Sequence, residues 1–166
     1  MLLIRDYHNH PEYIQALAMS VRRQWEQQGQ GEHLLMSFHG IPQRSEDEGD
    51  PYGHQCRRTA ALLAEALGLS PEQWSASFQS RFGKQEWLKP YTDVTIAQLA
   101  EQGVKRLDVI CPAFSADCLE TLEEIQVENR AVFMDAGGEQ FHYIPALNSD
   151  QAHIRMMVSL ICRALA

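Results

Sequence analysis

The sequence lacks both a long apolar run and an excess of basic residues. No stretch reaches the roughly 18 apolar residues that a membrane-spanning helix needs, and the first residues, MLLIRDYHNHPEY, turn polar too soon for a signal peptide. Lys and Arg number 14 against 22 Asp and Glu, for a net charge of −8. Since nucleic-acid binding needs a basic face, we expect no nucleic-acid partner, no transmembrane segment and, by default, a cytoplasmic location.

Closely spaced cysteines are also absent. The chain has Cys56, Cys111, Cys118 and Cys162, with no CxxC pair and none of the short spacings that zinc and iron–sulfur sites use. We therefore expect free thiols, buried or incidental, in a reducing compartment.

The glycine motifs of two large enzyme classes are missing as well. Neither GxGxxG nor GxxxxGK[ST] occurs, which argues against a nucleotide-binding protein. The GxSxG turn of serine hydrolases is absent too. Any chemistry must therefore come from other side chains.

The apolar pattern that is present alternates between strands and helices. The chain of 166 residues suits one domain, 1–166. Its predicted helix 54–68 ends at Gly68, a typical C-terminal glycine. Strand–helix alternation predicts an α/β fold, a parallel sheet of about four strands with helices on both faces. The predicted strands are 32–40, 74–80, 105–114 and 141–147, the helices are 10–31, 54–68, 92–103, 115–138 and 149–166, and the main loops are 44–53 and 81–90.

Polar side chains follow two of the predicted strands. His39 comes after LLMSF, and Ser115, Asp117 and Glu120 come after LDVICPAF. In an open α/β sheet the carboxyl ends of strands border the ligand crevice, so these groups can converge there. An imidazole facing a carboxylate can accept protons or hold a divalent cation, and two such ligands alone would make an open metal site.

Structural interpretations of the same residues stay open at this point. A lone His at a strand end is often a hydrogen-bonded structural residue. Asp117 and Glu120 have the spacing of a helix capping box, in which the glutamate would only bind a backbone N–H. By default Tyr52 is a turn residue and Arg81 a solvated loop cation.

Five segments in order nevertheless resemble the ferrochelatase family, whose members insert ferrous iron into protoporphyrin IX to make protohaem. The match runs from about Arg5 to near the C-terminus. The segments are LLMSFHGIP, GDPYGHQCRRTAALLAEALGL, FQSRFGKQEWLKPYTD, VICPAFSADCLETLEEI and AGGEQFHYIPALN.

The resemblance implies roles for the residues that match the family's motifs. The histidine of the SxHG-type motif falls on His39 and the glutamate of the DxLETL motif on Glu120. In the family these two face each other across the porphyrin cleft as metal ligands and as acceptors of the pyrrole protons. Fe²⁺ and protoporphyrin IX are thus the implied substrates, and the candidate porphyrin-cleft residues are Tyr52, Arg81, Trp87 and Ser115.

The chain also departs from the family's pattern. Cys118 stands where many members have a histidine, and only Cys162 lies near the C-terminus, so we expect no [2Fe–2S] cluster. A complete member has two similar lobes, of which this chain resembles the C-terminal one.

The missing N-terminal lobe implies weak or no activity for the chain alone. It also implies an exposed apolar inter-lobe face on which a homodimer can form. The alternatives are a related chelatase that inserts cobalt and a non-catalytic tetrapyrrole- or metal-binding module.

Overall fold

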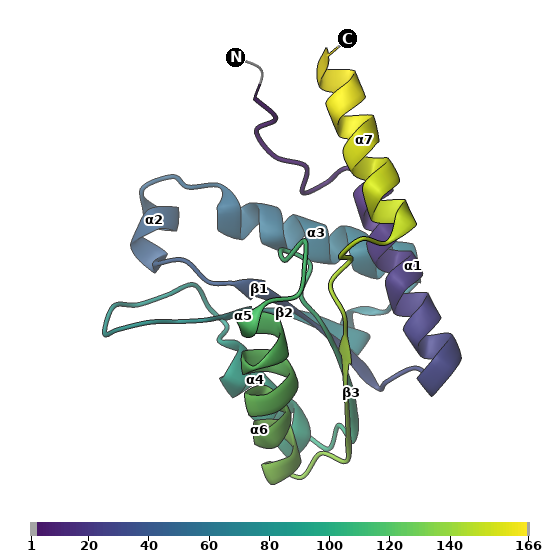
Figure 1. The fold of residues 1–166 in the computed structure, drawn as a ribbon. Helices are drawn as coiled ribbons and strands as arrows, with labels where there is room; N and C mark the ends of the chain where they lie inside the picture. Colours follow the sequence, from purple (N-terminus) through teal and green to yellow (C-terminus); the bar gives the residue numbers. More distant parts are fainter. Residues whose placement is uncertain (1–2, 166) are drawn as a thin grey trace.

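A computed structural model describes residues 3–165, and its centre is a four-stranded parallel sheet in the order β2-β1-β3-β4 (Figure 1). All three strand pairs are parallel. The predicted α/β class and the four predicted strands are thereby confirmed. The strands are β1 (His33–His39), β2 (Trp74–Gln79), β3 (Arg106–Ile110) and β4 (Gln140–Ile144).

Helices cover both faces of the sheet. One face carries α1 (Pro11–Gln28) and α3 (Tyr52–Leu67), with α7 (Gln151–Leu165) packed against α1. The other face carries α4 (Thr92–Glu101) and α6 (Arg130–Asp135). The shorter elements are α2 (Gln43–Asp47), η1 (Pro71–Gln73), α5 (Leu119–Leu122) and η2 (Glu124–Asn129). No helix within residues 3–165 is both long and apolar enough to cross a membrane.

Strand β1 explains why the sheet is covered on both sides. Its Leu34, Met36 and Phe38 belong to the core beneath α1 and α3, while Leu35 belongs to the core beneath α4 and α6. Successive side chains of a strand point to opposite faces. A strand that is apolar at nearly every position must therefore be buried on both faces, as parallel sheets require.

The predicted helix 115–138 differs from the structure. Helical structure begins only at Leu119 and is divided into α5, η2 and α6, of which η2 is a π-helix with Glu128 N–H donating to Glu123 O. The preceding Asp117 cannot join the helix because its carboxylate binds Tyr143, Ala146 and Asn148.

Other boundaries also differ. The predicted strands 105–114 and 141–147 end early, at Ile110 and Ile144, and the predicted helix 10–31 ends at Gln28. Helix α2 occupies part of the predicted loop 44–53, and α3 begins at Tyr52, two residues before its predicted start. The end of α3 is as predicted, because Gly68 adopts the left-handed conformation (φ 73°) and its N–H bonds back to Ala64 and Glu65.

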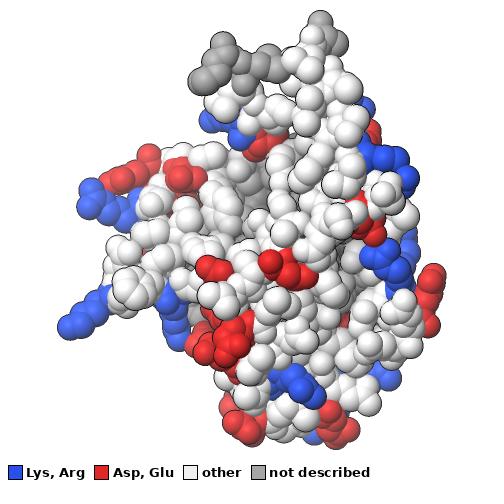
Figure 2. Space-filling view, viewed as in Figure 1, with Lys and Arg blue, Asp and Glu red and all other residues white. Residues whose placement is uncertain are grey.

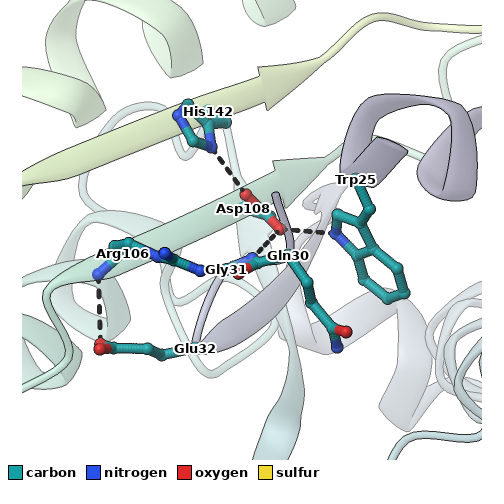
Figure 3. Close-up of polar contacts among 7 residues, drawn as sticks. All are labelled: Trp25, Gln30, Gly31, Glu32, Arg106, Asp108 and His142. Atoms are coloured by element: carbon teal, nitrogen blue, oxygen red, sulfur yellow. Dashed lines mark hydrogen bonds and ion pairs between the residues drawn. The ribbon is translucent and has the colours of Figure 1, made fainter. Parts of the chain in front are cut away.

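A buried carboxylate ties the elements together toward the amino ends of the strands (Figure 3). Asp108 of β3 is 1% exposed and accepts hydrogen bonds from Trp25 Nε1 (2.6 Å), Gly31 N–H (2.8 Å) and His142 Nδ1 (3.1 Å). These donors come from α1, the turn after it, and β4. The network fixes the scaffold at the end of the sheet opposite His39, the last residue of β1.

Candidate active site

The strand order creates a crevice between β1 and β3. These two strands are neighbours in the sheet. After β1 the chain runs to α3 on one face of the sheet, whereas after β3 it runs through α5 and η2 to α6 on the other face. Where neighbouring strands send their connections to opposite faces, a ligand crevice opens outside their carboxyl ends. His39 ends β1 and Glu120 lies in the first helix after β3.

His39 is half-buried and has one ring nitrogen engaged. Its Nδ1 lies 2.7 Å from the carbonyl oxygen of Gly40. Because a carbonyl only accepts, Nδ1 carries the proton, and the neutral ring then has its lone pair on Nε2. No group within residues 3–165 hydrogen-bonds to that Nε2, so the lone pair is free to accept a proton or to bind a metal ion.

Glu120 is a carboxylate with a lowered pKa. Hydrogen bonds from its own backbone N–H and from the Cys118 thiol lower the pKa of this carboxyl, and the nearby His39 adds to the effect. The capping-box interpretation of Asp117 and Glu120 is wrong, since the backbone N–H of Asp117 donates to Asn148 Oδ1 at 2.9 Å and Cys118 is the residue that caps the helix. The carboxylate of Glu120 is thus not used in a capping bond.

Tyr52 and Trp87 support the end of β1. The Tyr52 hydroxyl donates to the backbone carbonyl of His39 at 2.9 Å. Gly40 has no room for a side chain, because a Cβ there would lie 2.9 Å from the carbonyl oxygen of Gln79 and 3.2 Å from the Trp87 ring. The indole of Trp87 therefore lies against the backbone next to His39.

The other two cleft candidates lie in different surroundings. Arg81 donates to Asp93 at 2.5 Å, and its guanidinium lies 4.4 Å from the centre of the Tyr91 ring. Arg81 also lines the same hollow as Glu120. Ser115 instead contacts the N-terminal segment, with its hydroxyl 3.3 Å from that of Tyr7.

An acidic hollow of about 470 Å³ borders Glu120. Figure 2 shows carboxylates gathering on this face over α5. Among the described residues, no three His, Cys, Asp or Glu side chains are arranged to hold a metal ion. The lining residues are Ser80, Arg81, Phe82, Leu119, Glu120, Glu123, Glu124 and Glu128.

Sequence reasoning missed three residues of this region. Gln79 and Ser80, at the end of β2, contact the Glu120 segment, and Glu124 accepts hydrogen bonds from both. Gln79 and Ser80 could have been found by the signal that marked His39, because they are polar residues at the end of an apolar strand, in the stretch SFQS.

Comparison with known proteins identifies the family. The family model Ferrochelatase matches residues 1–165. The chain belongs to the ferrochelatase family. It is 85% identical over 164 residues to the ferrochelatase of Aeromonas hydrophila, covering 99% of this chain and 51% of that protein. The ferrochelatase of Vibrio parahaemolyticus is 60% identical over 158 residues, which cover 95% of this chain and 49% of that protein.

The chain thus spans about half the length of the ferrochelatases that it matches. A solved structure also shares the fold, that of CbiX, described as the terminal enzyme for biosynthesis of siroheme in denitrifying bacteria. The TM-score is 0.61 at 21% identity, over 95% of this chain and 60% of that one.

Cys118 replaces the histidine that the ferrochelatase resemblance leads one to expect. Burial raises the pKa of this thiol, and the neighbouring Glu120 raises it further. The thiol therefore stays protonated at neutral pH and serves Glu120 as a hydrogen-bond donor.

Proposed function

We propose that this chain is one lobe of a ferrochelatase, and that His39 and Glu120 serve the insertion of Fe²⁺ into protoporphyrin IX as metal ligands and proton acceptors. One observation carries the proposal: His39, whose Nε2 has no hydrogen-bond partner among the described residues, ends β1 at the switch point of the sheet, and its charge helps to lower the pKa of the Glu120 carboxyl. Membership of the ferrochelatase family supports it.

The chemistry of metal insertion needs both kinds of group. The porphyrin loses two pyrrole N–H protons as one Fe²⁺ enters, so the charge balances. The Nε2 lone pair of His39 can take one proton and the Glu120 carboxylate the other. The same two groups can first replace part of the hydration shell of the metal ion and then take up the protons as the ion passes to the ring.

We propose that the other half of the ferrochelatase covers an apolar stripe on α7. Ile154, Val158, Ile161 and Leu165 recur at helical spacing, and each is at least 41% exposed. Figure 1 shows α7 extending away from the sheet. Exposed apolar stripes of this kind seek partners, and about half of the matched relatives' length is available to supply one.

Without that partner, two copies of the chain should pair through the same stripe. Sedimentation analysis should then detect a homodimer that Val158→Glu abolishes. A monomeric wild-type chain would contradict this pairing. We also propose a cytoplasmic location, which the four free cysteines favour because thiols stay reduced there.

The test of the function is protoporphyrin metallation with Zn²⁺ as a redox-stable surrogate for Fe²⁺. The chain is assayed alone and with the other half of the Aeromonas hydrophila ferrochelatase. We expect activity in the mixture and its loss in His39→Ala and Glu120→Ala. Activity retained in both variants would overturn the roles given to these residues. Porphyrin binding without metallation would favour a tetrapyrrole-binding module instead.

A further inference from the structure

One buried side-chain amide connects the ends of three strands to the Glu120 segment. Gln79, the last residue of β2, is 3% exposed and is the register partner of His39. Its Oε1 accepts from the Ser37 hydroxyl of β1 at 2.8 Å and from the Cys111 thiol, directly after β3, at 3.4 Å. Its Nε2 donates to the backbone carbonyl of Glu120 at 2.7 Å.

The orientation of this amide is determined by its partners. The Glu120 carbonyl can only accept, so the NH₂ group of Gln79 must face α5. The amide oxygen then faces the hydroxyl and the thiol. Since Gln79 is buried, no water replaces a lost partner at low cost.

The segment that carries Glu120 needs such external support. Helix α5 has only four residues and continues into the π-helix η2, so its own backbone bonds do little to fix its position. A second contact acts beside the first. The Glu124 carboxylate accepts from the backbone N–H and the hydroxyl of Ser80, each at 2.6 Å, and Ser80 adopts φ 63°.

We propose that Gln79 is a positioning residue that holds Glu120 at its working distance from His39. The inference rests on the function proposed above. The backbone of His39 is fixed in β1, and Gln79 lies beside it in β2. Because the Gln79 amide lies beside His39 and binds the backbone of Glu120, it fixes the position of Glu120 relative to His39. Residues that orient metal ligands in this way typically contribute tenfold or more to metal affinity.

The experiment measures Co²⁺ affinity of the 166-residue chain by calorimetry and by the visible absorption of bound Co²⁺. His39→Ala and Glu120→Ala define binding at the pair. Gln79→Met removes the amide at similar length and should weaken Co²⁺ binding about tenfold. In the Glu120→Ala background the same change should have no further effect, because Gln79 acts through Glu120.

Two controls separate positioning from general damage. Gln98→Met makes the same substitution at an exposed position of α4. Asp108→Ala destabilises the far end of the sheet. Both should bind Co²⁺ like the wild type.

The outcomes distinguish the two proposals. If neither His39→Ala nor Glu120→Ala changes Co²⁺ affinity, the proposed site is wrong and the role of Gln79 falls with it. If both abolish binding while Gln79→Met binds like the wild type, only the role of Gln79 is overturned. Should Gln79→Met fail to fold, Gln79→Ala takes its place, because it removes the amide without introducing a buried charge.

Discussion

Replacing Asp108 should separate the contribution of its charge from that of its hydrogen bonds (Figure 3). One oxygen, Oδ2, accepts from both Trp25 Nε1 and Gly31 N–H, while Oδ1 faces His142. In Asp108→Ala, Trp25 and Gly31 lose the acceptor that they share, and His142 loses its own. In Asp108→Asn the amide oxygen can occupy the Oδ2 position and keep both bonds, with the NH₂ group turned toward the imidazole nitrogen.

The expected loss of stability follows from these contacts. A hydrogen bond to a charged group contributes about 1.5–3 kcal/mol. Trp25 and Gly31 are both only partly buried, so we take the lower end of this range. Two such bonds predict a loss of about 3 kcal/mol for Asp108→Ala and about 1 kcal/mol for Asp108→Asn. Against a typical domain stability of about 5–15 kcal/mol, the first change is large.

The assay is urea unfolding of the wild type and both variants. Parallel transitions with an unchanged m-value show that the midpoint shift measures stability. Equal losses in Asp108→Ala and Asp108→Asn would refute the reasoning, because they would mean that the charge matters and the shared acceptor oxygen does not. A loss below about 1 kcal/mol in Asp108→Ala would refute it too, because the network would then contribute little.

Two further predictions concern the carboxylates near the crevice. Cys118→Ala removes a donor to Glu120, so the pKa of that carboxyl should rise, as measured by carbon NMR of the side chain; an unchanged pKa would exclude the thiol as donor. Burial raises the pKa of Asp117, but hydrogen bonds from Asn148, Tyr143, Ala146 and Thr121 outweigh burial and lower it. The stability that these bonds confer is present above the ordinary pKa of Asp and is lost as the pH falls through the lowered value. Asp117→Asn should therefore flatten the acid limb of the stability profile, and an unaltered acid limb would contradict this.

The sequence predicts the layers of the fold because its local signals agree with one another. Strand β1 is apolar on both faces, and Gly68 ends its helix where a left-handed residue is needed. Each of these features depends on residues that are close in the chain, so pattern and structure coincide.

The helix after β3 is predicted less well because long-range contacts decide its form. Asp117 binds residues of β4 and of the segment after it, which keeps the chain out of a helix until Leu119. The extra residue of the π-helix is likewise accommodated by side chains, since Asn129 Nδ2 donates to the Glu124 carbonyl at 2.7 Å. Neither contact is visible in a periodic pattern.

The candidate site is predicted in part for the same reason. His39 stands out because it directly follows an apolar strand. Where Glu120 lies relative to His39 depends on the strand order, which the sequence does not specify. Gln79 escaped notice because its function depends on partners in β1, after β3 and in α5, which only the folded chain brings together.

Both members of the proposed pair, and the amide between their segments, lie in this one chain. We therefore expect β1, β2 and α5 to hold the proposed pair without the rest of a full-length ferrochelatase. Enclosing a porphyrin is different, because an exposed hollow beside Glu120 gives a flat macrocycle only one wall. Metal binding and porphyrin metallation should thus separate: the chain alone should bind Co²⁺ through His39 and Glu120, and metallation should appear only when the other half is supplied.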